Sequence, residues 1–223
     1  MQNKKILILA AHPDDETLGC GATIARLSKE GAHIKLLTFT DGVSARIPQS
    51  TKSQPLINRN IKLGEVCEKL GINDYVFANY PDNRLDIISL YDKVRYINSN
   101  VDFQPDLIFT HHPNCLNIDH KHVYEATLVA FRPEHGYKCK ILSYYVPSST
   151  DFNPRNNFNG NVYYDVTTSY RTKLECLKEC YDIEMRPYPH TRSYKNVENL
   201  MKVWGSEVGL KYAEKFELIR DII

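Results

Sequence analysis

The sequence lacks a surplus of charge of either sign, because 28 Lys and Arg residues face 27 Asp and Glu residues and leave a net charge of +1. Such a weak field does not favour a polyanion, which excludes nucleic acid and an acidic membrane surface as main partners. The sequence also lacks any apolar run of the ~18 residues that a membrane helix needs. The apolar segment 6–11 is cut at His12 and is too short for a signal peptide. We therefore expect a small or neutral substrate and no membrane span.

The six cysteines lack both a Cys-x-x-Cys motif and the density of a disulfide framework, which favours a reducing, cytoplasmic location. Cys176 and Cys180 lie four residues apart on an expected helix, but no second ligand pair accompanies them, so ordinary packing is favoured. A length of 223 residues suits one sizeable domain and is short for two, so we expect a single domain over 1–223. The sequence shows no heptad or self-complementary patch and leaves a homo-oligomer open.

Strand and helix signals alternate along the chain. Strands are expected at 4–10, 33–40, 75–78, 107–110 and 141–146. Helices are expected at 16–30, 56–70, 87–100, 119–131, 169–182 and 194–220, the first two ending at Gly31 and Gly71. Residues 43–55 and 147–165 indicate loops, the second a long surface excursion. This alternation predicts an α/β fold, a Rossmann-like doubly wound, mostly parallel sheet with helices on both faces.

The run His12-Pro13-Asp14-Asp15-Glu16 follows directly on the first buried strand. Ligands bind at this edge of an open α/β sheet. One His and two adjacent carboxylates supply a nitrogen ligand, an oxygen ligand and a spare base, the set that a hydrolytic Zn²⁺ site needs. The same acidic residues also suit a helix N-terminus, where they complement the helix dipole, but that role needs no His.

A second informative stretch runs from Thr110 to His120 and leaves another expected strand at the same edge. Two segments about a hundred residues apart can therefore face each other across one site. Within this stretch His120 is the strongest candidate ligand, with Asp119 either capping the helix or orienting the imidazole.

These segments resemble the zinc-dependent N-deacetylases of the PIG-L or LmbE-like family. The resemblance covers most of the chain and rests on the blocks 11–16, 40–42, 82–86, 117–120, 190–193 and 204–216, together with Arg59 twelve residues before Gly71. The first of these blocks, with a distal Asp-His, is quite specific, whereas the others are weak alone. The resemblance implies removal of an acetyl group from an N-acetylated small molecule, typically an N-acetylglucosamine-type sugar or sugar conjugate.

The resemblance also implies roles for particular residues. His12, Asp15 and His120 match the three zinc ligands, and Asp14 matches the general base. Asn117 stands where members commonly carry a His that holds the tetrahedral intermediate. An Asn amide can donate a hydrogen bond there but cannot relay a proton.

The general acid is therefore left open among His111, His112 and His190. Cys115 stands where many sequences of this subtype are acidic. For substrate binding we select Arg59, Arg84, His112 and His190, the arginines because their forks recognise phosphate or carboxylate. The sequence does not choose among zinc, iron and cobalt.

The chemistry of these residues agrees with the resemblance, because Zn²⁺ can activate water and polarise an amide while Asp14 moves the proton. A nucleotide- or nucleotide-sugar-binding transferase or oxidoreductase is disfavoured, since the first strand-to-helix turn lacks Gly-x-Gly-x-x-Gly and its acidic residues would repel a pyrophosphate. A metal-binding module without catalysis would keep the three ligands but have no use for Asp14.

Overall fold

The computed structural model describes residues 2–45, 53–155 and 157–223. Its strands form one sheet of seven in the order β3-β2-β1-β4-β5-β7-β6. The first five in this order are parallel to one another, whereas β7 pairs antiparallel with both β5 and β6. The strands are β1 (Lys5–Ala10), β2 (His33–Thr40), β3 (Asp74–Tyr80), β4 (Leu107–His111), β5 (Lys140–Tyr144), β6 (Val162–Asp165) and β7 (Ala213–Arg220).

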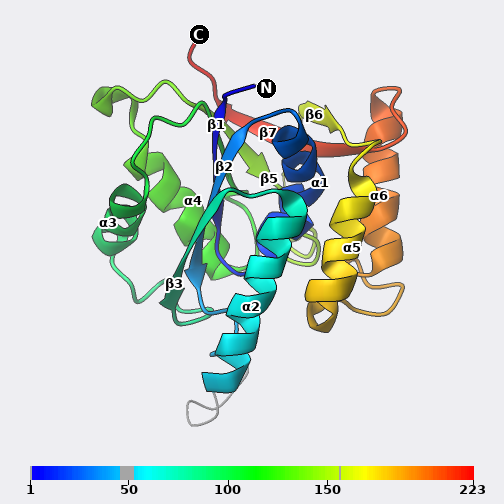
Figure 1. The fold of residues 1–223 in the computed structure, drawn as a ribbon, viewed down its shortest axis with the longest axis horizontal. Coiled ribbons are helices and arrows are strands. Elements are labelled where there is room, and N and C mark those ends of the chain that lie inside the picture. The colour runs from blue at the N-terminus through cyan, green and yellow to red at the C-terminus, as the bar shows by residue number, and fades with distance from the viewer. Residues whose placement is uncertain (1, 46–52, 156) are drawn as a thin grey trace.

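Helices cover both faces of the sheet (Figure 1), with α3 and α4 on one face and α1, α2, α5 and α6 on the other. They are α1 (Asp15–Lys29), α2 (Ser53–Leu70), α3 (Leu90–Asn100), α4 (Ile118–Ala130), α5 (Tyr170–Cys180) and α6 (Tyr194–Glu207), with 3₁₀ turns η2 (Pro133–His135) and η3 (Asp182–Glu184). The predicted fold class is therefore confirmed. Two hydrophobic cores result, one on each side of the sheet.

Strand β1 supplies both cores because its side chains alternate between the two faces. Ile6, Ile8 and Ala10 pack into one core, while Leu7 and Leu9 pack into the other. All five are fully buried, as expected of a central parallel strand. The chain leaves this strand at the carboxyl edge of the sheet, where the His12 segment begins.

Helix α1 is broken at Cys20, whose φ of −145° and ψ of 18° are not helical. A break frees backbone groups that need partners in a buried helix. The Glu214 carboxylate of β7 accepts the N–H groups of Ala22 and Thr23, and the Lys173 ammonium donates to the Leu18 carbonyl. The break is thereby satisfied by side chains from elsewhere in the chain.

The sequence prediction was wrong near the C-terminus, where a helix over 194–220 was expected. Helix α6 ends at Glu207, and 213–220 form β7 instead. Gly209, with φ of 74°, ends the helix, and the Leu210 N–H bonds back to the Gly205 carbonyl. The Glu- and Lys-rich strand resembles a helix by composition, but pairing on both sides decides its structure. The expected excursion 147–165 likewise contains β6.

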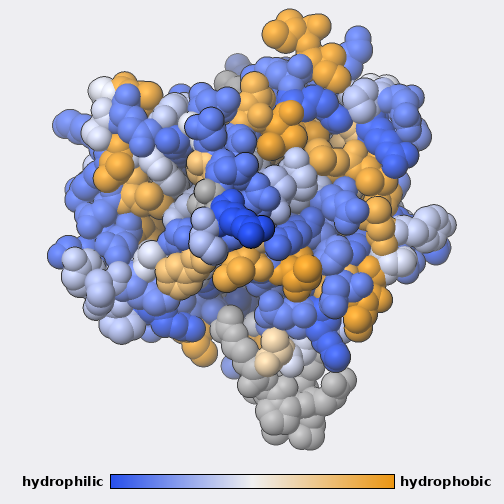
Figure 2. Space-filling view, turned by 180° about the vertical axis from the view of Figure 1, so that it is seen from behind, coloured by the Kyte–Doolittle hydropathy of each residue, from blue (hydrophilic) through white to orange (hydrophobic). Residues whose placement is uncertain are grey.

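The remaining predicted elements are present with shifts of a few residues at their ends. Gly31 and Gly71 end their helices with φ of 83° and 73°. The predicted loop 43–55 falls partly outside the described residues. Figure 2 shows one face of the molecule on which hydrophilic residues predominate and hydrophobic ones form separate patches. Among the described helices, none is long and apolar enough to cross a membrane.

Candidate active site and metal centre

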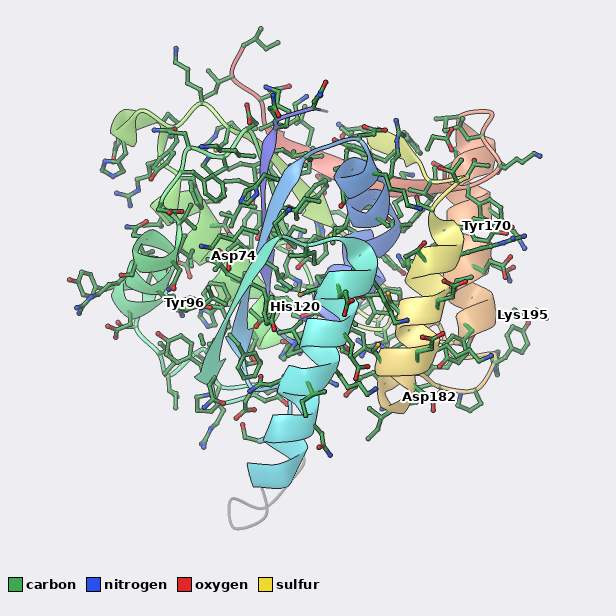
Figure 3. All side chains as sticks on the ribbon, viewed as in Figure 1. Asp74, Tyr96, His120, Tyr170, Asp182 and Lys195 are labelled. Atoms are coloured by element: carbon green, nitrogen blue, oxygen red, sulfur yellow. The ribbon has the colours of Figure 1, made fainter. Side chains whose placement is uncertain are left out.

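The site residues gather at the carboxyl edge of the parallel strands. His12 follows β1, Asp82 follows β3, and His120 lies in the first turn of α4 after β4. His120 is buried, and Figure 3 shows it near the centre of the view, whereas Tyr170 and Lys195 lie near its edge. The two sequence segments that were expected to face each other across the sheet edge do so.

Three donor atoms converge on one point. Oδ2 of Asp15 lies 3.0 Å from Nδ1 of His12 and 3.3 Å from Nε2 of His120, and the two imidazole nitrogens are 3.3 Å apart. All three side chains are buried. Two imidazole nitrogens and one carboxylate oxygen are the donors of a catalytic zinc site with open positions, so the residues fit a divalent metal.

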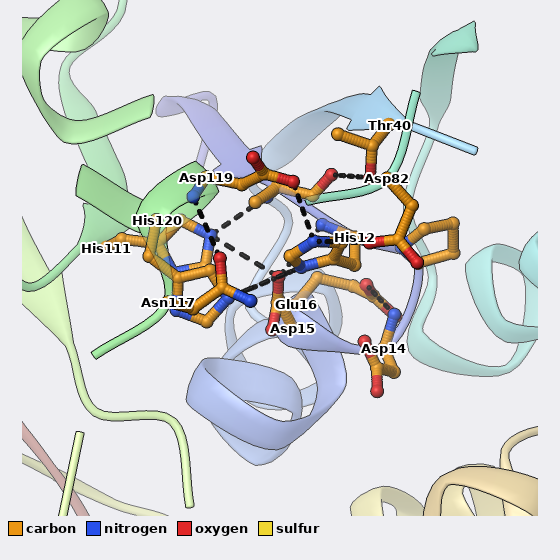
Figure 4. Close-up of polar contacts among 12 residues, drawn as sticks. His12, Asp14, Asp15, Glu16, Thr40, Asp82, His111, Asn117, Asp119 and His120 are labelled. Carbon is orange, nitrogen blue, oxygen red and sulfur yellow. Dashed lines mark hydrogen bonds and ion pairs between the residues drawn. The ribbon is translucent and has the colours of Figure 1, made fainter. Parts of the chain in front are cut away.

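The other nitrogen of His12 is held by two carboxylates. Nε2 lies 3.1 Å from Asp119 Oδ2 and 3.1 Å from Asp82 Oδ1 (Figure 4). Asp119 is itself fixed, because its two oxygens accept the N–H groups of Asn83 and Leu85. A proton on Nε2 leaves Nδ1 free to bind a metal.

The other nitrogen of His120 contacts sulfur. Nδ1 lies 3.1 Å from Cys115 Sγ, which in turn lies 3.1 Å from the Thr150 hydroxyl. The ring of His120 also stacks on His111, with 3.9 Å between centroids. His111 Nε2 accepts the Ala11 N–H and so supports the site from behind. These contacts orient Nε2 of His120 toward Asp15.

Electrostatics couple the three candidate ligands. Burial disfavours charge on each of them, but the surrounding imidazoles hold the pKa of Asp15 well below its usual value. In return, and again against burial, Asp15 raises the pKa of His12 well above its usual value and that of His120 to about 9. A metal ion therefore competes with protons for both imidazoles.

Asp14 lies beside this group in an unusual backbone conformation, with φ of 142° and ψ of −26°. It is the N-cap residue of α1, but its side chain accepts no hydrogen bond from the helix. Its carboxylate instead faces two guanidinium groups, with 3.3 Å to Arg192 Nη1 and 3.8 Å to Arg59 Nη2. Burial and the charge of Asp15 raise the pKa of Asp14 to about 7, against the opposing effect of both arginines. That value suits a general base.

Asn117 has a fixed amide orientation. As N-cap of α4 its Oδ1 accepts the Asp119 N–H at 2.8 Å, and its Nδ2 donates to Asn83 Oδ1 at 3.0 Å. Since Oδ1 is used by the helix and one N–H of Nδ2 by Asn83, the second N–H of Nδ2 is the donor that remains for other partners.

These side chains surround a polar cavity of about 50 Å³. By the measure in which one water needs 10–15 Å³, this space holds a few water molecules. The lining residues are His12, Asp14, Asp15, Gly42, Arg59, Asp82, Asn83, Asn117, His120, Ser149 and Arg192.

Of the four residues predicted to bind substrate, only Arg59 lines the cavity. Arg84 is exposed beside the cavity residue Asn83, and His190 is half-buried, accepting the Arg192 N–H. The structure does not bring His112 into the cavity: its Nδ1 lies 3.1 Å from Glu217 Oε2, and burial lowers its pKa to about 4. His111 and His112 are consecutive at a strand end, so they point to opposite sides.

Sequence reasoning missed Arg192 and Asp82 as residues of the cavity. Both lie in blocks that carry the family resemblance, 190–193 and 82–86. The resemblance therefore pointed to these segments but did not single out the two residues. Arg192 follows η3 in a turn without periodicity, and only the fold brings it to Asp14.

The comparisons with known proteins agree with this site. The family model of PIG-L, GlcNAc-PI de-N-acetylase, matches residues 7–131. The chain is similar to the uncharacterized deacetylase YaiS of Escherichia coli (strain K12), with 31% identity over 80% of this chain and 91% of that protein. It is also 32% identical to a 1D-myo-inositol 2-acetamido-2-deoxy-alpha-D-glucopyranoside deacetylase of Kribbella flavida, over 48% of this chain and 38% of that one.

Among solved structures, the N,N'-diacetylchitobiose deacetylase of Pyrococcus horikoshii superposes with a TM-score of 0.77 at 21% identity, over 97% of this chain and 84% of that one. At that identity the likeness shows the fold alone. The family match covers more than half of the chain and YaiS is matched over most of its length. The chain therefore belongs to the PIG-L (GlcNAc-PI de-N-acetylase) family, whose relatives named above are deacetylases, that is, amide hydrolases.

Proposed function

We propose that this protein is a zinc-dependent N-deacetylase that hydrolyses the acetamido group of an N-acetylglucosamine-type sugar or sugar conjugate. One observation carries the proposal: a carboxylate with a pKa raised to about 7, Asp14, shares a cavity with a buried His-Asp-His donor set. A site that only binds metal has no use for such a base.

His12, Asp15 and His120 would hold the ion. The donor set of two imidazoles and one carboxylate supports zinc, although iron and cobalt accept the same ligands. A divalent cation bound there supplies Lewis acidity, which polarises an amide carbonyl and lowers the pKa of water toward ~7.

Asp14 takes a proton from the attacking water and returns it to the leaving amine, for which a pKa near 7 is suited. The Asn117 amide donates a hydrogen bond to the oxygen of the tetrahedral intermediate. Arg192 contributes positive charge at the cavity wall beside Asp14. Contacts of substrate with Arg59, Arg84, His112 and His190, and the choice of general acid, stay predictions.

The size of the cavity supports a small reacting group. About 50 Å³ leaves room for an acetamido end, so the remainder of a substrate lies in the mouth or displaces Arg192. The inositol glycoside deacetylase among its relatives acts on a sugar, which supports an acetamido sugar as the substrate class here.

A single domain over 1–223 is supported by the sheet, whose strands come from residues 5 to 220. A reducing, cytoplasmic location is supported by six cysteines that are free and buried. A homo-oligomer stays a prediction to be tested by light scattering.

The test is a deacetylation screen with the zinc-loaded protein. N-acetylglucosamine, its nucleotide and lipid conjugates, chitobiose and thiol glycosides are incubated with the protein, and released acetate is measured. We expect release from at least one of these, and a loss of about 10²-fold or more in Asp14→Asn at equal zinc content. Equal turnover in Asp14→Asn, or no release from any compound, contradicts the proposal.

A further inference from the structure

A single peptide bond, between Pro13 and Asp14, is held by charged side chains at both of its polar ends. Its N–H donates to Glu16 Oε2 at 3.0 Å, as Figure 4 shows, and its carbonyl accepts a hydrogen bond from Arg59 Nη2. An anion at the N–H and a cation at the carbonyl fix the plane of this peptide. The orientation of that plane determines φ of Asp14, the residue proposed as general base.

The conformation of Asp14 requires such support. A φ of 142° is one that a residue with a Cβ rarely adopts, so the backbone is strained at this position. Such strain persists only where the surroundings impose it. In this conformation the carboxylate points away from its own helix and lines the cavity.

Both carboxylate oxygens of Glu16 are engaged within the protein. Its side chain is fully buried and does not line the cavity, and its second oxygen accepts the Thr17 hydroxyl at 2.7 Å. In a capping box the third helical residue reaches back to the N-cap N–H, whereas here the second one does so. Glu16 therefore cannot serve as an alternative base, although it directly follows both other carboxylates of the motif.

Arg59 is equally confined. Its Nη1 donates to Glu184 Oε1 at 2.8 Å, and its guanidinium carbon lies 5.4 Å from the centroid of the Tyr181 ring. Gly42, with φ of 63°, closes the wall, because a Cβ there would lie 3.0 Å from Pro13 Cδ and 3.3 Å from Arg59 Nε. The guanidinium thus has little freedom to leave the Pro13 carbonyl.

We propose that Glu16 and Arg59 are positioning residues that clamp the Pro13–Asp14 peptide and so aim the Asp14 carboxylate into the cavity. The effect on turnover rests on the proposed function, whereas the effect on the Asp14 backbone does not.

Two readouts test the clamp in Glu16→Met, Glu16→Gln and Arg59→Met. The first is hydrogen exchange of the Asp14 amide, followed by NMR on the metal-free protein. We expect exchange at least 10-fold faster in Glu16→Met and Arg59→Met, with protection kept in Glu16→Gln, because Gln retains an oxygen that accepts the N–H. Unchanged exchange in both Met variants overturns the clamp, whatever the activity.

The second readout is the split between kcat and KM on the zinc-loaded protein. A misplacement of about 1 Å can cost about 10²-fold, so we expect kcat to fall by about that factor in both Met variants, with KM and zinc content unchanged. Glu16→Gln should restore kcat to within a few-fold. A raised KM with normal kcat in Arg59→Met would make Arg59 a substrate contact instead. Equal losses of kcat in Glu16→Gln and Glu16→Met would show that the Glu16 oxygen which accepts the Asp14 N–H has no positioning role.

Glu214→Gln is the matched control. Glu214 is also fully buried and also accepts backbone N–H groups of α1, but at the break near Cys20. The Glu214→Gln variant should change the stability of the protein but neither the hydrogen exchange of the Asp14 amide nor kcat. Should Glu16→Met not fold, Arg59→Met and Glu16→Gln still decide between clamp and substrate contact. A wild-type protein without deacetylase activity would refute the proposed function. The clamp would then be tested by hydrogen exchange of the Asp14 amide alone.

Discussion

Two buried ionic clusters contact helix α1, one at its break and one at its N-terminus. The scaffold cluster is Lys173 with Glu214, whose charged atoms lie 2.6 Å apart. The cavity cluster is Asp14, Arg59, Glu184 and Arg192. Both bring carboxylate and cation together at largely buried positions, yet they differ in how closely each charge is paired.

In the scaffold cluster, Glu214 accepts two N–H groups of α1 at 3.2 Å and 2.7 Å, and Lys173 donates to the Leu18 carbonyl at 2.7 Å. Neither residue lines the cavity. In the cavity cluster Asp14 is 3.3 Å and 3.8 Å from its cations, on a strained backbone. The comparison teaches that burial of charge alone does not mark a reactive group. Burial and the charge of Asp15 raise the pKa of Asp14 to about 7, and the two arginines at these distances do not reverse that shift, so Asp14 has a proton to exchange.

The largest effect on turnover is expected from removal of a ligand. His120→Ala takes away one of three donors, so zinc content and activity should both be lost. Metal analysis of the purified variant, beside His112→Ala, measures this. Full zinc occupancy in His120→Ala together with loss of zinc in His112→Ala would show that His112, and not His120, is the ligand.

A pH–rate series examines Asp14 itself. With a pKa of about 7 the carboxylate is ionised, and able to act as base, only above that pH, so kcat/KM should fall below pH ~7. The Arg192 charge lowers this pKa, so Arg192→Met should move the acidic limb to higher pH. Arg84→Met, at an exposed position outside the cavity, is the control and should leave the limb in place. A limb that stays near pH 4–5 in the wild type would contradict this assignment.

Asn117 has two roles that substitutions can separate, as N-cap of α4 and as the proposed oxyanion donor. Asn117→Ala should lower kcat by about 10-fold to 10³-fold through the lost oxyanion donor, and should cost ~1 kcal/mol of stability through the lost N-cap. Asn117→Asp keeps the cap but not the donor, so it should keep the stability and lose at least as much kcat. Thermal unfolding and steady-state kinetics on both variants measure this, and normal kcat in Asn117→Asp would remove the donor role.

Cys115 should act on metal affinity more than on turnover. Its contact with His120 Nδ1 holds a candidate ligand, and loss of such a partner typically costs 10- to 100-fold in affinity. We expect zinc to bind at least 10-fold more weakly in Cys115→Ala, as measured by competition with a chelator. Cys176→Ala, at a buried cysteine of the α5 core, should bind zinc normally. Equal affinity in the two variants would show that the sulfur contact is dispensable.

The smallest effect on turnover is expected in the scaffold cluster. Lys173→Met leaves Glu214 buried without its cation, which should cost about 3–5 kcal/mol of unfolding free energy. Turnover per bound zinc should nevertheless stay close to that of the wild type. Chemical denaturation and kinetics on one preparation measure both quantities. A large fall in kcat per zinc would erase the distinction between the clusters.

Much of this could be predicted because parallel strands end at one edge. The apolar run before His12 and the strand before His111 indicate where the two segments leave the sheet, and hence that they meet. The alternation of side chains along β4 could also have shown that His111 and His112 do not share a site, since consecutive strand residues point to opposite faces.

The remainder depends on contacts that carry no local pattern. Arg192 reaches Asp14 from 178 residues away, and its turn has no hydrophobic period to locate it. Strand β7 was taken for helix because Ala, Glu, Lys and Leu favour helices, and only pairing with β5 and β6 overrides that preference. The peptide before Asp14 likewise contacts Arg59 of α2 as well as Glu16 of the motif, and the motif alone does not reveal that distant arginine.

The position of β7 between β5 and β6 has a consequence for synthesis on the ribosome. Strand β5 is made some seventy residues before the strand that pairs with its outer edge, and β6 has no neighbour in the sheet until β7 arrives. Glu214, which satisfies the break in α1, also emerges only when β7 is made. We therefore expect nascent chains that stop before residue 213 to expose an open sheet edge and to engage chaperones, and the active site to form only after β7 has docked.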